Sequence, residues 1–391
     1  MNILIVTPIL FEKASPFNHL MRDILKGLLD AGHQITRIIA VENEVDTDYR
    51  MGLNGIKYIP VIRKRSQKTN VITRYMTDML ANIKMARLIK TVHADVLFED
   101  VSYSSYWSVR AAKRLGIRVV SMLQDVWPDN AVQSGLLKAN GVIYSCFELL
   151  QKKVYKLSDK LICISDDMKK FIELKSVPDK KIYVIYNWGC TDKPVDITWE
   201  NNAFVREFGL KKELFYVIYA GNIGRMQNVE LIVKAADVLA DYKNIFFLII
   251  GDGVKKDAIR EVVSEKRLEN VRLLPLQPAE MATAIYSAGG VNIVPLVADG
   301  IKTALPSKTG VIFSCGGRAI FCFGKDSKFS KIIELYNAGK CVDSDDVDDL
   351  VRCILDYQKN QYEKNGMFEI YNALFSRREN VQKYMELIQN D

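Results

Sequence analysis

The chain has 391 residues, of which 49% are hydrophobic and 26% charged, a globular composition long enough for two hydrophobic cores. The apolar start lacks the basic segment and cleavage site of a secretory signal, and no run of about 18 uncharged apolar residues predicts a membrane span. Seven cysteines without a CxxC pair and three scattered histidines argue against a disulfide framework and a zinc site. We expect a cytoplasmic protein without a bound metal.

The net charge of +7 is concentrated in the first half of the chain. Residues 1–190 contain 28 Lys and Arg against 19 Asp and Glu, a net charge of +9, whereas the remainder has a net charge of −2. Residues 57–90 contain one acid, Asp78, and nine basic residues: Lys57, Arg63, Lys64, Arg65, Lys68, Arg74, Lys84, Arg87 and Lys90. We expect this face to meet an anionic partner.

Short apolar runs alternate with longer amphipathic stretches along the whole chain, which is the pattern of parallel α/β architecture. In the first half, strands are predicted near residues 2–7, 34–41, 57–62, 95–98, 117–122, 160–164 and 182–185. Helices are predicted over residues 18–31, 71–92, 103–115 and 145–156. In the second half, strands are predicted near residues 215–220, 245–250, 271–274, 291–295 and 319–323, again with helices between them.

The aperiodic segment 187–202 is the predicted linker between two cores. We therefore expect an N-terminal domain over residues 1–190 and a C-terminal domain over residues 191–365. The final helical stretch, residues 366–391, is a candidate to pack back on the first domain.

A glycine turn at residues 219–225 (YAGNIGR) links a predicted buried strand to a helix. Glycine backbone can approach a phosphate closely, and a helix N-terminus favours negative charge. Asn222, Gly224 and Arg225 therefore form a candidate anion cradle, in which Arg225 would neutralise a diphosphate. A tight turn with a solvated arginine explains this segment equally well when it is taken alone.

Two further segments of the second half carry similar signals. In residues 305–309 (LPSKT), Ser307 is predicted to cap a helix, and Lys308 to face the same phosphates from the opposite wall. Residues 249–253 (IIGDG) form a glycine turn after another strand, and ligands of open α/β sheets bind along the carboxyl edge of the strands. Asp252 in this turn is either a ligand contact or a structural residue.

The order of these motifs carries a family resemblance. YAGNIGRMQNVELIVKAADVL, IIGDGVKKDAI, NVRLLPLQPAEMATAIYSAGGVNIVPL and TALPSKTGVIFSCGGRAIF resemble the donor domain of glycosyltransferase family four. LLDAGHQITRI, QDVWPDNAVQSG, ICISDDMKKFI and VIYNWGCTD resemble the first domain of its bacterial surface-polysaccharide subgroup, which contains fucosamine transferases. The resemblance implies a GT-B fold, with two Rossmann-like domains facing each other across a cleft. It also implies a retaining transferase with a UDP-sugar donor and no tightly bound metal.

The resemblance assigns roles to individual residues of the donor domain. It implies that Gly224 and Arg225 hold the diphosphate, and that the backbone from Leu274 to Leu276 holds the uracil edge. It further implies that three residues close on the diphosphate: Ser307, Lys308 and Thr309. We expect Arg225 and Lys308 to converge on one pyrophosphate.

The chain departs from the family pattern at several positions. Thr303 and Val311 stand where most members have two glutamates eight residues apart, and Gln227 and Asn228 stand where a second basic residue usually follows the arginine. Paired glycines expected after the first strand are replaced by Pro8 and the segment 15–18. The missing glutamates leave open a catalytically silent GT-B binding subunit. A sugar-nucleotide epimerase with the same cleft is a further alternative, for which His19 is the nearest histidine.

On the acceptor side, a carboxylate is needed to take the proton of the attacking hydroxyl. Asp125 is the first candidate for this base, and Glu99 and Asp100 follow the preceding strand. One of these two carboxylates could instead cap the helix that begins near residue 103. Trp127 either stacks on a sugar or packs in the core.

The stretch 70–92 has apolar residues at helical spacing, with basic residues around them. It is either a core-facing helix with a solvated basic side or a basic face resting on anionic lipid. We predict a retaining UDP-sugar glycosyltransferase of bacterial capsule or O-antigen assembly, peripheral at the inner face of the plasma membrane. Its predicted acceptor is a polyprenyl-diphosphate-linked saccharide, and no motif indicates a nucleic-acid partner.

Overall fold

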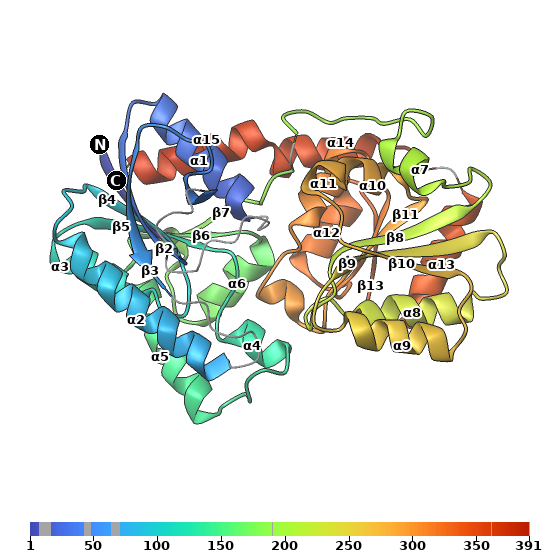
Figure 1. The fold of residues 1–391 in the computed structure, drawn as a ribbon, viewed down its shortest axis with the longest axis horizontal. Coiled ribbons are helices and arrows are strands. Elements are labelled where there is room, and N and C mark those ends of the chain that lie inside the picture. Colours follow the sequence, from blue (N-terminus) through green and yellow to red (C-terminus); the bar gives the residue numbers. More distant parts are fainter. Residues whose placement is uncertain (8–16, 43–47, 64–70, 190, 361, 391) are drawn as a thin grey trace. The chain divides into compact units, whose positions relative to one another are not determined.

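The computed structural model describes residues 1–391 except 8–16, 43–47, 64–70, 190, 361 and 391, and except the side chains of residues 71–74. The chain forms two compact units. Unit 1 comprises Met1–Val132, Leu137–Tyr186 and Arg378–Asp391, and unit 2 comprises Gln133–Leu136 and Asn187–Arg377. Each unit contains one parallel sheet with helices on both faces (Figure 1).

The sheet of unit 1 has seven strands in the order β3-β2-β1-β4-β5-β6-β7. They are β1 (Asn2–Thr7), β2 (Gln34–Val41), β3 (Ile56–Ile62), β4 (Val96–Asp100), β5 (Arg118–Leu123), β6 (Lys160–Cys163) and β7 (Ile182–Val184). All neighbouring strands are parallel, and the central strands are apolar along their length because helices cover both faces. The strand order reverses between β1 and β4, which is the position where open α/β sheets bind ligands.

The helices of unit 1 form two layers around this sheet. The main helices are α1 (Phe17–Asp30), α2 (Val71–Ile89), α3 (Tyr106–Arg114), α4 (Asp129–Gln133), α5 (Val142–Leu157), α6 (Asp166–Leu174) and α15 (Arg377–Gln389), with short turns η1 (Asp48–Arg50) and η2 (Asp179–Lys181). Helices α2, α3 and α5 lie side by side on one face (Figure 1). Helices α1 and α15 pack together so closely that a Cβ at Gly27 would lie 2.8 Å from the Met385 sulfur.

The chain end belongs to unit 1. Arg118, at the start of β5, donates hydrogen bonds to the carbonyls of Ile388 and Asn390, and Lys160, at the start of β6, donates to Leu387 and Asn390. Cations at these last carbonyls offset the negative end of the helix dipole. Of the stretch expected to return to the first domain, only the part from Arg378 onward does so, and the preceding turns remain in unit 2.

The sheet of unit 2 has six parallel strands in the order β10-β9-β8-β11-β12-β13. They are β8 (Phe215–Asn222), β9 (Ile245–Asp252), β10 (Val271–Leu274), β11 (Val291–Pro295), β12 (Ala319–Cys322) and β13 (Lys340–Val342). The first five were predicted from the apolar runs, whereas the edge strand β13 was not predicted, because it begins with a lysine and has only two apolar residues. The strand order reverses between β8 and β11, so this edge is the expected ligand edge of the unit.

Helices cover both faces of the second sheet. They are α7 (Ala203–Phe208), α8 (Val229–Val238), α9 (Lys256–Glu265), α10 (Ala282–Ala288), α11 (Lys308–Ser314), α12 (Lys328–Leu335), α13 (Val347–Lys359) and α14 (Asn365–Ile370), with short turns η3 (Ala279–Met281) and η4 (Gly300–Lys302) and a π-helical turn η5 (Tyr371–Phe375). The packing of α8, α9 and α13 on strands β8, β9 and β12 buries a large apolar cluster. No helix in the described part of the chain combines the length and apolar character needed to cross a bilayer.

Candidate functional site

Two glycine turns lie side by side at the carboxyl edge of unit 2. Gly221 pairs with Gly251 and Asn222 with Asp252, because β8 and β9 end in register. Gly251 has a φ of 156°, and a Cβ there would overlap the Gly221 carbonyl oxygen. The backbones are also joined directly, since Ile223 N donates to the Asp252 carbonyl at 2.7 Å. Only glycine permits this approach, which leaves bare backbone at the edge.

Lys308 lies against the first of these turns. Its Nζ is 3.8 Å from the centroid of the Tyr219 ring, and a Cβ at Gly221 would lie 2.9 Å from that nitrogen. The Nζ is buried, with no hydrogen-bond partner in the described part of the chain. Burial lowers the pKa of Lys308 to about 7. The contact with the aromatic face offsets part of this desolvation, but an unpaired buried amine is a costly feature that an anion would relieve.

The two neighbours of Lys308 differ from each other. Thr309 is buried, and its hydroxyl also has no hydrogen-bond partner among the residues described. Ser307 is exposed and has helical φ and ψ angles, and its side chain does not cap α11. The predicted cap is therefore wrong, because an N-cap side chain reaches the helix amides from an extended conformation.

Arg225 and Asn222 are exposed in the turn after β8. Arg225 makes no ion pair with any residue that the structure describes, so its guanidinium is available to a ligand. Gly224 has no room for a side chain, because a Cβ would lie 2.6 Å from both the Asn222 amide nitrogen and the Gln227 amide oxygen. The roles of these residues in binding stay predictions.

The remaining predicted donor residues lie at the same edge. Asp252 accepts a hydrogen bond from Gly253 N at 2.9 Å and forms an ion pair with Lys256 at 3.4 Å, which supports its structural interpretation. Leu274 ends β10 and is buried, whereas Leu276 is 58% exposed. Because β10 neighbours β9, these leucines lie beyond the second glycine turn along the edge.

In unit 1, Glu99 and Asp100 end β4 and are buried. Both Glu99 oxygens lie 2.6 Å from Ser108 Oγ, and burial raises the pKa of Glu99 to about 8 against the lowering by hydrogen bonds from Ser108 and Ser105. Burial and the nearby Asp125 raise the pKa of Asp100 to about 8, against the lowering by Arg37. Near neutral pH both carboxyls therefore favour the protonated form, and Glu99 serves to hold α3 on the sheet.

Asp125 follows β5 and differs from the buried Glu99 and Asp100 in its exposure to solvent. Its side chain is exposed to solvent. The crowding of the carboxyl by protein atoms raises its pKa to about 6, although a hydrogen bond from Asn130 opposes this. Of the three candidate bases, Asp125 alone combines access to solvent with ionisation at neutral pH.

Trp127 belongs to a cluster of four aromatic rings. Its ring centroid lies 5.1 Å from that of Tyr75, 5.4 Å from Tyr103 and 5.6 Å from Phe147. These edge-on and tilted contacts favour the packing interpretation over stacking on a sugar.

Part of the predicted basic face is absent from the surface. Arg63 is buried and forms an ion pair with Asp78, so it cannot rest on a lipid. Three other basic residues of the stretch, Lys64, Arg65 and Lys68, lie outside the described residues, as do the Arg74 side chain and the loop that contains Pro8.

Comparison with known proteins identifies the family of both halves. Residues 18–192 match the family model described as Glycosyltransferase Family 4, and residues 200–373 match the model described as Glycosyl transferases group 1. The chain belongs to the glycosyltransferases. The narrower fucosamine-transferase resemblance stays a prediction.

Individual glycosyltransferases resemble the chain more weakly. WbjE of Pseudomonas aeruginosa, named as a probable glycosyltransferase, is 26% identical over 60% of this chain and 58% of its own length. WcaI of Escherichia coli (strain K12), named as a putative colanic acid biosynthesis glycosyl transferase, is 25% identical over 61% of this chain and 60% of its own length. The alignments thus span less than two thirds of either relative.

The fold is that of the GT-B glycosyltransferases. The crystal structure of Anabaena HepE in complex with UDP and glucose superposes with a TM-score of 0.71 at 13% identity, covering 100% of this chain and 99% of that one. At this identity the likeness establishes the fold alone, and donor, acceptor and mechanism rest on the site.

In this glycosyltransferase, the positions matched to the family's glutamate pair carry no carboxylate. Thr303 and Val311 are both buried, and the Thr303 hydroxyl donates to the Gly300 carbonyl at 3.2 Å. Among the described residues, no three His, Cys, Asp or Glu side chains gather as metal ligands. Besides Asp252, this edge presents the Lys308 amine and the bare backbone of the two glycine turns.

Sequence reasoning missed Arg37, which is wholly buried on β2. Its Nε and Nη2 both lie 3.2 Å from the Thr7 hydroxyl, and burial lowers its pKa to about 10, against the raising by Tyr58 and Asp100. The detectable signal was a charged residue inside an otherwise apolar strand. Arg37 gives the buried Asp100 a cationic neighbour near the point where the strand order of unit 1 reverses.

Proposed function

We propose that this glycosyltransferase transfers a sugar, with retention of configuration, from a UDP-sugar to a polyprenyl-diphosphate-linked saccharide in bacterial capsule or O-antigen assembly. The observation that carries the donor half is the buried Lys308 amine, which has no hydrogen-bond partner among the described residues and lies against the glycine turn after β8. A diphosphate is the anion that this combination of bare backbone and cation suits.

The proposed chemistry uses charge at the leaving group. When the bond from the sugar to the diphosphate breaks, its electron pair goes to the departing UDP, and negative charge grows on the phosphate oxygens. Lys308 and Arg225 would stabilise that charge where it develops. Because the Lys308 site is dehydrated, its contribution is larger than that of a solvated lysine.

We assign the acceptor side to unit 1. Asp125 would take the proton of the acceptor hydroxyl, since its carboxyl is exposed and largely ionised at neutral pH. Binding at the inner membrane surface follows from the lipid-linked acceptor. Two parts of the proposal, the retained configuration and the lack of a metal requirement, rest on the family resemblance.

The names of related proteins support the class of pathway and donor. WcaI is named for colanic acid biosynthesis, and HepE was crystallised with UDP and glucose. The buried Thr303 and Val311 favour one alternative, a binding subunit without catalysis.

Radiolabelled UDP-sugars offered with bacterial membrane lipid extract test the proposal. Label in the lipid fraction supports the transferase, free isomerised UDP-sugar the epimerase, and binding without turnover the silent subunit. The Lys308→Met variant is the matched negative control, and the anomeric configuration of the product, read by NMR, tests retention.

A further inference from the structure

A basic groove of about 460 Å³ runs between α3 and α5 on unit 1. Five of its seven lining residues are basic, and none is acidic: Arg110, Lys113, Arg114, Lys153 and Lys156. Tyr106 also lines the groove, with the Lys153 amine 5.6 Å and the Arg110 guanidinium 5.8 Å from the centroid of its ring. Like charges gathered this closely repel one another, and an anion in the groove would relieve the repulsion.

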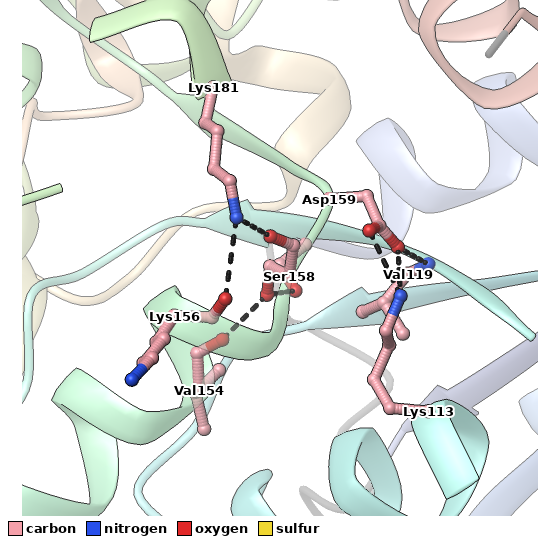
Figure 2. Close-up of polar contacts among 8 residues, drawn as sticks. Lys113, Val119, Val154, Lys156, Ser158, Asp159 and Lys181 are labelled. Carbon is pink, nitrogen blue, oxygen red and sulfur yellow. Dashed lines mark hydrogen bonds and ion pairs between the residues drawn. The ribbon is translucent and has the colours of Figure 1, made fainter. Parts of the chain in front are cut away.

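One of these five cations forms an ion pair within the part of the chain that the structure describes, and four do not. Lys113 is the exception, because its amine lies 2.8 and 2.9 Å from the two Asp159 oxygens (Figure 2). Lys181 nearby is also occupied, since it donates to the carbonyls of Ser158 and Lys156. Figure 2 shows the Lys156 amine directed away from these contacts. None of the other four cations forms an ion pair with any residue in the described ranges: Arg110, Arg114, Lys153 and Lys156.

Exposed apolar side chains continue the groove along α5. The residues at positions 142, 146, 149, 153 and 156 recur every three or four positions, so they form one stripe of the helix. The stripe begins with Val142, which is 88% exposed, and Leu149, which is 55% exposed, and it ends with Lys153 and Lys156. A helix with an exposed apolar part beside basic residues is the pattern of interfacial membrane binding.

The position of the groove separates it from the proposed reaction site. Its four unpaired cations lie on the second halves of α3 and α5, which lead into the first residues of β5 and β6. Asp100 and Asp125 lie at the opposite, carboxyl end of the strands. An acceptor diphosphate undergoing reaction belongs at that carboxyl edge, so the groove needs a different anionic occupant.

We propose that the groove between α3 and α5 is a docking site for the headgroups of an anionic phospholipid membrane. The four unpaired cations hold the lipid phosphates, and Val142 and Leu149 enter the boundary between headgroups and acyl chains. This inference deepens the proposed function, because it rests on the lipid-linked acceptor and names the surface that brings unit 1 to the bilayer. It is a different surface from the face expected over residues 57–90, in which Arg63 is buried while Lys84, Arg87 and Lys90 are exposed.

Co-sedimentation of the full chain with vesicles tests this surface. The vesicles are phosphatidylcholine alone and phosphatidylcholine mixed with phosphatidylglycerol, without nucleotide or acceptor. The groove variant replaces Arg110, Arg114, Lys153 and Lys156 by Gln. A control variant with the same change in net charge replaces four exposed lysines of unit 2 by Gln: Lys234, Lys243, Lys331 and Lys359.

We expect the wild type to bind the anionic vesicles, and the control variant to bind them almost as well. Each basic residue near an anionic surface contributes about a five-fold gain in partitioning, so the groove variant loses about two orders of magnitude or more. A second variant, Val142→Ser with Leu149→Ser, keeps every charge and is expected to weaken binding as well.

Several outcomes overturn the proposal. They are a wild type that ignores anionic vesicles, a groove variant that binds like the wild type, and a control variant that loses as much binding as the groove variant. Thermal melting and UDP-glucose affinity, measured on every variant, are expected to match the wild type. Because vesicle binding needs no donor, its failure leaves the proposed transferase activity standing, and a failed transferase assay leaves the vesicle result standing.

Discussion

The Lys308→Met variant tests the charge on which the donor site depends. A pKa lowered from 10.5 to about 7 means that burial in the empty site disfavours the ammonium by about 5 kcal/mol. Methionine is similarly long and keeps the contact with the Tyr219 ring without the charge. We expect the variant to be more stable than the wild type without nucleotide. We also expect it to bind UDP-glucose about ten- to a hundred-fold more weakly, since a hydrogen bond to a charged group contributes about 1.5–3 kcal/mol.

The same lysine predicts a pH dependence of defined sign. In the empty site Lys308 loses its proton as the pH rises through about 7, and a bound diphosphate raises its pKa by favouring the charged form. UDP-glucose binding therefore takes up a proton, and the affinity is greatest below pH 7 and falls above it. Folding shows the opposite trend, because the unfolded amine keeps its proton up to about 10.5. Stability consequently rises with pH between about 7 and 10.5, and the methionine variant loses that rise.

Isothermal titration calorimetry in buffers of different ionisation enthalpy measures both the affinity and the proton uptake. UDP-glucose is a better probe than UDP, because its diphosphate has no group that titrates near neutrality. Lys308→Arg is the control, since its guanidinium stays charged and its binding is expected to be independent of pH. Wild-type affinity that is equal on both sides of pH 7, or a methionine variant with unchanged affinity, would refute the reasoning.

Three further variants probe the remaining parts of the site. Arg225→Ala is expected to weaken UDP-glucose binding by about 1.5–3 kcal/mol in calorimetry without changing the melting temperature, because the side chain is exposed; unchanged affinity would remove Arg225 from the site. Asp125→Asn is expected to abolish transfer while the UDP-glucose affinity stays at the wild-type value. In the wild type, kcat/KM is expected to fall as the pH drops below about 6, because the base must be ionised. An asparagine variant that retains turnover would exclude Asp125 as the base. Gly251→Ala is expected to lower stability far more than Gly209→Ala, because the Cβ added at Gly251 would overlap the Gly221 carbonyl oxygen. Gly209 is the matched control, since it also has a positive φ but its added Cβ meets nothing within 4 Å. Equal melting temperatures of the two variants would contradict the close contact of the two turns.

The periodicity of the sequence was sufficient to predict most of the strands. Runs such as residues 215–220 and 245–250 are apolar because their strands are covered on both faces, so the pattern records burial directly. The same reasoning placed Gly224, Arg225 and Lys308 after strands, at the edge where parallel strands end together. It failed for the edge strand β13, which begins with a lysine and has only two apolar residues, and for the Ser307 cap, which depends on one pair of backbone angles.

The sequence by itself determined the alternation of strands and helices, the excess of positive charge in the first half, and the motifs that mark a glycosyltransferase. Only the tertiary structure decided which charges are buried and which are free. Arg63 and Arg37 are as basic in sequence as Arg110, yet the first two are enclosed by the fold and the third lines an open groove. Lys308 is one lysine among many until the crossover from β11 brings it against Tyr219. Burial and pairing arise from contacts between residues far apart in the chain, and local patterns do not record those contacts.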